Sequence, residues 1–143
     1  MVGFLGSHLH SIDAKGRVSL PAQFRRGHES EPFILIHVQP DALSLLPEES
    51  WAELQRELRE MARREPGFRG NLLSITALAS EVTPDKQGRI LIPDRLREAV
   101  GLGSEALIVG AIDKIEIWEP ARFERSTSVV SEEFDRFIRK IFA

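Results

Sequence analysis

Two short segments of this 143-residue chain carry the side chains best suited to bind another molecule. Each segment has the form D-x-x-G-R, with Gly three residues and Arg four residues after Asp. An arginine guanidinium is a planar fork of donors that fits a phosphate or the O6 and N7 atoms of guanine. A lysine at or beside the tip of such a segment is placed to contact a phosphate. The residues are Asp13, Lys15 and Arg17 in the first segment and Asp85, Lys86 and Arg89 in the second.

The same pattern has a purely structural interpretation as a tight turn between two strands. Asp accepts backbone N–H groups in such turns, and Gly supplies a positive φ. The arginine would then lie across the turn and pair with the aspartate. From one copy this interpretation is the stronger. Two copies that both keep the arginine favour binding, because a turn does not require a long charged side chain.

Other chemistry finds little support in the sequence. His8 and His10 would share one face of a strand, but a metal site needs further ligands and none is visible nearby, so we expect no metal. The GLGS string at 101–104 lacks the ending of a phosphate-binding loop. The chain has no cysteine and no recognisable nucleophile–base set, so we expect neither an enzyme nor a bound cofactor.

The composition and the distribution of charge further limit the kinds of protein that this chain can be. The formal net charge is −3, yet residues 14–27 contain Lys15, Arg17, Arg25 and Arg26 and no acid, which creates a local positive field. With no tyrosine and 7% aromatic residues, a base-stacking surface for single strands is not expected. The apolar stretches are too short to span a membrane and no signal peptide is evident, so we expect a cytoplasmic protein.

The two segments belong to an internal repeat. A shift of 72 residues aligns residues 7–51 with 79–123 without a gap and gives eight identical pairs, where chance would give about two or three. One identical pair is Arg25 and Arg97, which closes a Pro-x-x-apolar-Arg element after each D-x-x-G-R segment. These two arginines are therefore further candidates for contact with a nucleic acid.

Each copy predicts the same succession of elements. A strand leads into the D-x-x-G-R turn, and a second strand, a brief helical turn and two more strands follow. Each turn would join the strands beside it into a ribbon, so the chain would carry two ribbons. We expect strands at 7–12, 17–20, 33–38 and 43–46 in the first copy and at 79–83, 89–92, 106–111 and 114–118 in the second.

Helices are predicted after each copy. Apolar residues at helical spacing indicate helices at about 48–64 and 68–77, and Ser131 is a suitable N-cap for a last helix. The last helix has an apolar stripe that needs a partner surface, either the core of its own chain or a neighbouring subunit. The stripe consists of Phe134, Phe137, Ile138 and Ile141.

The segments IDAKGRVSLP and PDKQGRILIP resemble the paired D-x-x-x-R signatures of the MraZ family, whose members carry two AbrB-like (SpoVT–AbrB) repeats. The resemblance extends over nearly the whole chain. It implies an α+β fold in which both repeats form one pseudo-symmetric swapped-hairpin β-barrel with flanking helices. The implied boundaries are 7–50 and 79–122 for the repeats, 51–78 for a helical connector and 123–143 for a C-terminal helix.

The resemblance also implies a function. It points to a nucleoid-associated regulator that binds double-stranded promoter DNA of the division and cell-wall gene cluster, its own promoter included. It implies a ring-shaped homo-oligomer, which we expect to bind short direct repeats. The alternative is an antitoxin-like or other protein-interaction module that uses the barrel for assembly. Two repeats and a helical end count against that alternative.

Overall fold

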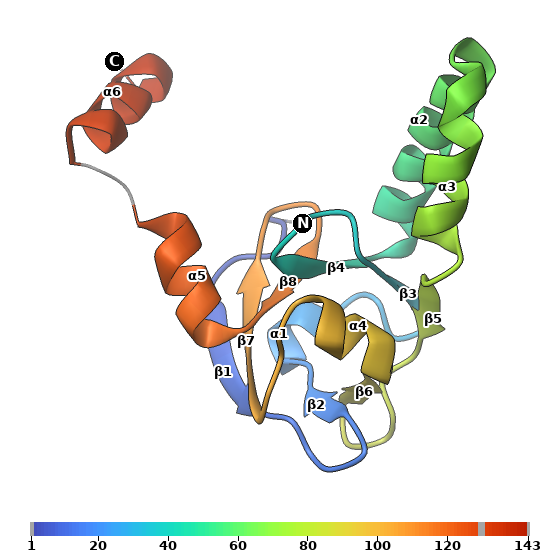
Figure 1. Cartoon of the computed structure of the whole chain (residues 1–143). Helices are drawn as coiled ribbons and strands as arrows, with labels where there is room; N and C mark the ends of the chain where they lie inside the picture. The colour runs from blue at the N-terminus through green and yellow to red at the C-terminus, as the bar shows by residue number, and fades with distance from the viewer. Residues whose placement is uncertain (1, 129–130, 143) are drawn as a thin grey trace.

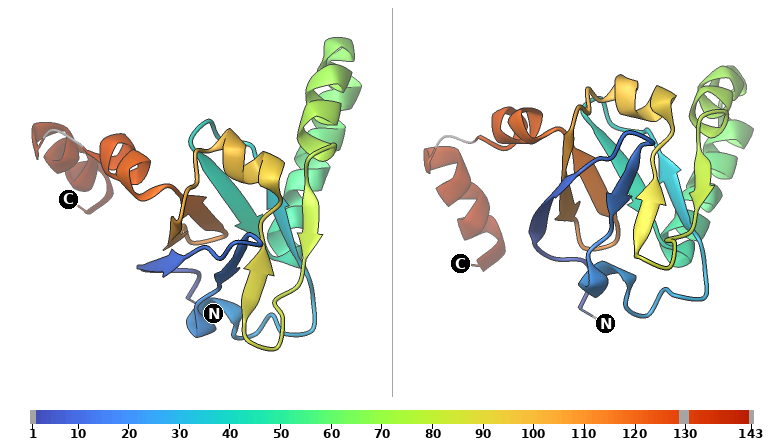
Figure 2. Two further views of the ribbon diagram at one scale, coloured as in Figure 1. Left: turned by 60° about the horizontal axis from the view of Figure 1, so that its bottom comes forward. Right: turned by 90° about the horizontal axis from the view of Figure 1, so that it is seen from below.

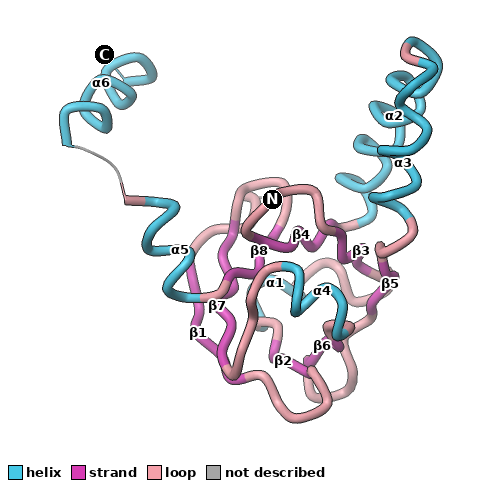
Figure 3. The backbone as a smooth tube through the Cα atoms, in the orientation of Figure 1, coloured by secondary structure: helices cyan, strands magenta, loops and turns pink. Residues whose placement is uncertain are grey.

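The computed structural model describes residues 2–128 and 131–142, and this part of the chain is α+β (Figures 1 and 3). Every predicted strand and helix is present, and the helix α5 is an addition. In chain order the elements are β1 (Ser7–Ser11), β2 (Arg17–Ser19), α1 (Ala22–Arg25), β3 (Phe33–Ile36), β4 (Ala42–Leu46), α2 (Glu48–Arg64), the 3-10 helix η1 (Pro66–Phe68), α3 (Arg69–Thr76), β5 (Ser80–Val82), β6 (Arg89–Leu91), α4 (Asp94–Ala99), β7 (Glu105–Gly110), β8 (Ile115–Trp118), α5 (Pro120–Thr127) and α6 (Ser131–Phe142).

The two copies of the repeat interlock through their strands. Six strands form an antiparallel sheet in the order β1-β7-β8-β4-β3-β5, and β2 pairs with β6 in a separate two-stranded ribbon. The first strand of each copy pairs with the third strand of the other, as β1 with β7 and β5 with β3. The fourth strands, β4 and β8, also pair across the copies. Within one copy only the third and fourth strands pair with each other, so the first and second strands depend on the other copy for a partner.

A local two-fold relation runs through this arrangement. In the ribbon, Val18 lies directly opposite Ile90, which is its own counterpart in the repeat. Both side chains are buried and face a common core. The largest fully buried side chains of that core come from both copies: Phe24, Phe33, Leu20, Leu35, Ile36, Leu43, Leu45, Ile90, Ile92, Leu96, Ile108 and Ile115.

The expectation of two ribbons is wrong, because β2 and β6 together make a single one. The expected closed barrel is not confirmed either. The outer strands of the sheet, β1 and β5, do not pair with each other, and the ribbon lies between them (Figures 1 and 2). The reason lies in the backbone of the turns: Leu20 N–H donates to the Gly88 carbonyl and Ile92 N–H donates to that of Gly16. These bonds continue the β2–β6 pairing by one residue pair at each end, so the strands that follow the two turns pair with each other and not with the outer strands of the sheet.

The helices other than α1 and α4, which bury Phe24 and Leu96, lie outside this interlocked core. Helices α2 and α3 lie side by side and project from the β3–β5 side of the sheet (Figure 1). The C-terminal segment contains two helices rather than one, since Pro120 begins α5 and the Glu119 carboxylate caps it. In α6 the stripe residues Phe134, Phe137 and Ile141 are each at least half exposed. Among the described residues, no helix has the length and apolar character needed to cross a membrane.

Candidate nucleic-acid interface

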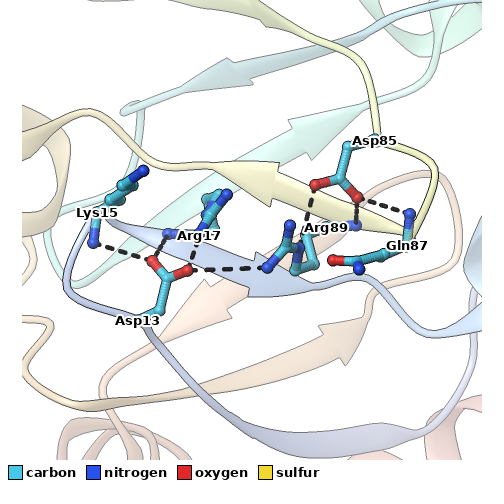
Figure 4. A network of polar contacts seen from close by, with 6 residues as sticks. All are labelled: Asp13, Lys15, Arg17, Asp85, Gln87 and Arg89. Atoms are coloured by element: carbon cyan, nitrogen blue, oxygen red, sulfur yellow. Dashed lines mark hydrogen bonds and ion pairs between the residues drawn. The ribbon is translucent and has the colours of Figure 1, made fainter.

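The first D-x-x-G-R turn fixes its arginine through the aspartate (Figure 4). The backbone N–H groups of Lys15 and Arg17 both donate to Asp13 Oδ1, at 3.0 and 2.9 Å. The Arg17 side chain donates from Nε to Asp13 Oδ2 at 2.8 Å. Because the bond uses Nε, it does not engage the two terminal nitrogens of the guanidinium. The aspartate therefore restrains the arginine and leaves its outer fork for another acceptor.

The second turn repeats this geometry at the other end of the ribbon (Figure 4). Asp85 Oδ1 accepts the backbone N–H groups of Gln87 and Arg89, each at 2.9 Å, and Oδ2 accepts Arg89 Nε at 3.0 Å. Arg89 Nη1 also lies 4.0 Å from Asp13 Oδ2, so one arginine faces the carboxylates of both copies. The two turns thus form one polar network along the ribbon.

The hydrogen bonds of the turns also stabilise the charged form of the aspartates. The backbone N–H of Arg17 is the main cause that lowers the pKa of Asp13 to about 2, with its side chain adding to the effect. The backbone N–H of Arg89 likewise lowers the pKa of Asp85. Both groups are carboxylates at neutral pH, so both Asp–Arg contacts are ion pairs.

We expect the Asp13 carboxylate to remain charged until the pH approaches 2. Its pKa in the folded chain lies below the ordinary value of 3.8, so its contribution to stability is present above pH 3.8 and is lost as the pH falls toward 2. A pH titration of the Asp13 carboxyl carbon by NMR measures this directly. In Asp13→Asn the free energy of unfolding should depend less on pH across that window. A midpoint near 3.8 in the native chain would contradict the turn geometry.

The outer face of the ribbon is formed by alternate residues. Val18 and Ile90 point into the core, so the side chains on either side of them point outward. The register places Arg17 opposite Leu91 and Ser19 opposite Arg89. The two arginines therefore occupy diagonal corners of one outward face. A two-stranded ribbon with such a face has the dimensions to enter the major groove of B-DNA.

The two lysines stand at opposite ends of this ribbon. Lys15 and Lys86 are both exposed, one in each turn. They are not equivalent by the repeat, since Lys15 aligns with Gln87 and Lys86 with Ala14. Each end still presents one ammonium group beside the outer face. Five of the eight predicted site residues lie together in Figure 4, namely Asp13, Lys15, Arg17, Asp85 and Arg89, and a sixth, Lys86, directly follows Asp85 in the second turn.

Arg25 and Arg97 are placed differently from the other six. Arg25 Nε donates to the Leu20 carbonyl at 2.9 Å, and its guanidinium lies over Gly88 in the other copy. Arg97 forms an ion pair with Asp94, and its guanidinium lies against Gly16. Each arginine thus covers the turn of the opposite repeat. Contact of Arg25 and Arg97 with a nucleic acid stays a prediction, whereas this cross-repeat packing explains why both copies keep the arginine.

Valine at Gly16 should destabilise the fold more than valine at Gly88. Both glycines have a positive φ, which costs a β-branched residue about 1–3 kcal/mol. A Cβ at Gly16 would also lie 2.8 Å from the Ile92 carbonyl oxygen, which is backbone, whereas at Gly88 the close atoms belong to the Arg25 side chain, which can move. Thermal melts of Gly16→Val and Gly88→Val measure the difference. Gly103→Val is the control, because a Cβ there meets nothing within 4 Å. Wild-type melting of both turn variants would contradict the turn assignment.

Comparison with known proteins agrees with the internal repeat. The family model described as "MraZ protein, putative antitoxin-like" matches the chain twice, over residues 4–71 and 75–139. The chain belongs to the MraZ family. Its relatives include the "Transcriptional regulator MraZ" of Acetivibrio thermocellus, 40% identical over 121 residues that cover 85% of this chain and 84% of the relative. The protein of the same name from Cutibacterium acnes is 34% identical over 140 residues, 98% of each chain. These names describe a regulator and not an enzyme.

In this MraZ-family chain the sequence alone does not single out Ser19 and Leu91. Both share one outward face with the two arginines because β2 pairs with β6 and not with its neighbour in the chain. The available signal was the alternation around Val18 and Ile90, which indicates that the flanking residues share the opposite face. The alternation identifies a face, but it does not say which strand lies beside it.

Proposed function

We propose that this MraZ-family chain is a transcriptional regulator that binds duplex DNA in a sequence-specific manner through the β2–β6 ribbon. The observation that carries the proposal is the pair of restrained arginines on one outward face. Arg17 and Arg89 are each held at Nε by an aspartate, at 2.8 and 3.0 Å. The terminal nitrogens of Arg17 remain for DNA, whereas Arg89 Nη1 also lies 4.0 Å from Asp13 Oδ2. The names of the relatives, transcriptional regulators, support the same function.

The ribbon would enter the major groove with its outer face toward the bases. Arg17 and Arg89 would donate to guanine O6 and N7 or to phosphate, while Lys15 and Lys86 would contact phosphates at the two ends. Asp13 and Asp85 act through the arginines as positioning residues, because their oxygens are engaged within the turns. Restraint before binding lowers the side-chain entropy lost on contact. Other proteins could not bind a promoter that is covered in this way.

The proposal extends to assembly and place of action. We assign the cross-repeat pairing of strands to a swapped-hairpin arrangement of two AbrB-like repeats. The exposed stripe of α6 would join copies of the chain into a ring, which would hold several ribbons against short direct repeats of a promoter. The targets would be the promoters of the division and cell-wall gene cluster, and the protein would act in the cytoplasm at the nucleoid.

A second candidate function comes from the words "antitoxin-like" in the description of the family model. Under this alternative, the interlocked sheet would serve assembly with a protein partner, and the ribbon would not read DNA. The relatives are named as regulators of transcription, which favours DNA binding. A DNA titration separates the two functions.

The proposal is tested by titrating the chain against duplex DNA from upstream of its own gene, at several salt concentrations. A scrambled duplex of the same length and composition is the control. We expect tighter binding to the upstream duplex, and binding constants that fall linearly with salt on logarithmic axes, because lysines and arginines displace counterions from phosphates. Equal affinity for both duplexes would reject sequence-specific recognition. Absence of salt-dependent binding would favour the antitoxin-like alternative.

A further inference from the structure

The outer face of the ribbon carries one apolar side chain that the arginines and lysines do not explain. We propose that Leu91 determines part of the sequence specificity by contacting the 5-methyl group of a thymine in the major groove. The inference rests on the proposed function, since it requires that the ribbon bind duplex DNA. It adds a hydrophobic contact to a site otherwise made of charged groups.

Leu91 is the exposed leucine that lies on the ribbon. Its side chain is 51% exposed, although the neighbouring Ile90 and Ile92 are buried at 1% and 0%. The alternation of the strand therefore turns Leu91 outward. The register puts it directly across from Arg17 on the same face, and it shares that face with Arg89 two residues earlier on its own strand. Any base that meets Arg17 lies close to Leu91.

The chemistry of the groove indicates which group Leu91 would meet. The major-groove edges of the bases consist of donors and acceptors, with the thymine methyl as their apolar group. A leucine against a donor or acceptor would remove its water without a replacing hydrogen bond, which is unfavourable. Against a methyl group the same side chain buries apolar surface. Leu91 therefore favours thymine beside the base or phosphate that Arg17 contacts.

Leu91 also makes the two ends of the ribbon chemically different. By the repeat, the counterpart of Leu91 is Ser19, which lies opposite Arg89. One end of the outer face thus pairs arginine with leucine, and the other pairs arginine with serine. A serine hydroxyl both donates and accepts, so it does not select a methyl group. The two ends would read different bases, and the DNA element would have a direction instead of being a palindrome.

The test compares the wild-type chain with Leu91→Ser, which gives both ends of the ribbon a serine. Both proteins are titrated against the upstream duplex of the chain's own gene, and against the same duplex with every thymine replaced by deoxyuridine, which lacks only the methyl group. We expect the wild type to lose about fourfold in affinity on the uracil duplex, the value of roughly one buried methyl group. Leu91→Ser should bind the thymine duplex more weakly and lose less than twofold on the change to uracil. The coupling between the two changes isolates the contact.

Leu73→Ser is the matched control, because Leu73 is 46% exposed on α3, away from the ribbon, and should behave as wild type on both duplexes. Since the Leu91 side chain is exposed, Leu91→Ser should melt close to the wild-type temperature. Equal sensitivity of the wild type and Leu91→Ser to uracil would overturn the thymine contact while sequence-specific binding stands. A wild type that does not distinguish the upstream duplex from a scrambled one would overturn the proposed function and this inference together.

Discussion

Replacing Arg17 with alanine should weaken specific DNA binding by about 1–3 kcal/mol, roughly five- to 150-fold, if the arginine donates from both terminal nitrogens to one base. Its Nε bond to Asp13 leaves those nitrogens in place for such a contact. The loss should be larger on the upstream duplex than on a scrambled duplex, because a base contact carries sequence information and a phosphate contact does not. Titration of both duplexes at one salt concentration measures it.

The structural interpretation of the turn makes a different prediction for the same variant. If Arg17 served only to close the turn, Arg17→Ala would lower the melting temperature and leave the affinity per folded molecule unchanged. The Arg17 and Asp13 side chains are 34% and 36% exposed, and ion pairs at such positions contribute little to stability. We therefore expect a nearly unchanged melt. Arg17→Lys is a useful companion, because it keeps the charge and loses the planar fork. It should recover non-specific binding and not specificity.

The order of the elements could be predicted from the sequence, because it depends on local patterns. Val18 and Ile90 alternate with polar or exposed positions, Pro47 precedes the helical spacing of α2, and Gly16 marks a turn. The pairing of strands could not be predicted in this way. Alternation identifies the buried face of a strand and not its neighbour, so the joining of β2 to β6 and the open sheet came only from the structure.

For the candidate site, too, the local turns could be predicted from the sequence and the contacts between the two copies could not. The repeat of Asp13, Gly16 and Arg17 predicted the turns, since each turn is closed by contacts within five residues. Contact of the arginines with DNA stays a prediction. Arg25 is kept in both copies as well, but its guanidinium packs on the turn of the other repeat. Retention in a repeat therefore does not distinguish a binding residue from one that holds the two copies together. Leu91 differs between the copies, and only the register places it opposite Arg17.

Substituting glutamate for Phe137 and Ile138 together should dissociate the proposed homo-oligomer and leave the interlocked core folded. Phe137 is 55% exposed in α6, and its stripe neighbours Phe134 and Ile141 are exposed to a similar degree. A stripe of this kind on a charged helix is typical of a surface that a partner covers. Two carboxylates in that contact would be desolvated without partners, which opposes association. Light scattering at micromolar concentration measures the mass, and circular dichroism checks the fold.

The same variant should separate binding to several DNA repeats from binding to one. In the proposed complex each subunit would neutralise only a handful of phosphates, so a single ribbon would bind weakly and with strong salt dependence. Subunits held together bind successive repeats at high effective concentration, which raises affinity by about 10²–10⁴ without new contacts. Loss of assembly should therefore cost at least about 100-fold on a multi-repeat duplex and little on a single repeat. The control is Arg136→Gln with Lys140→Gln, which changes the same helix outside the stripe and should keep both mass and affinity. A wild type that is monomeric at micromolar concentration and still binds the repeat array tightly would reject the link between assembly and affinity.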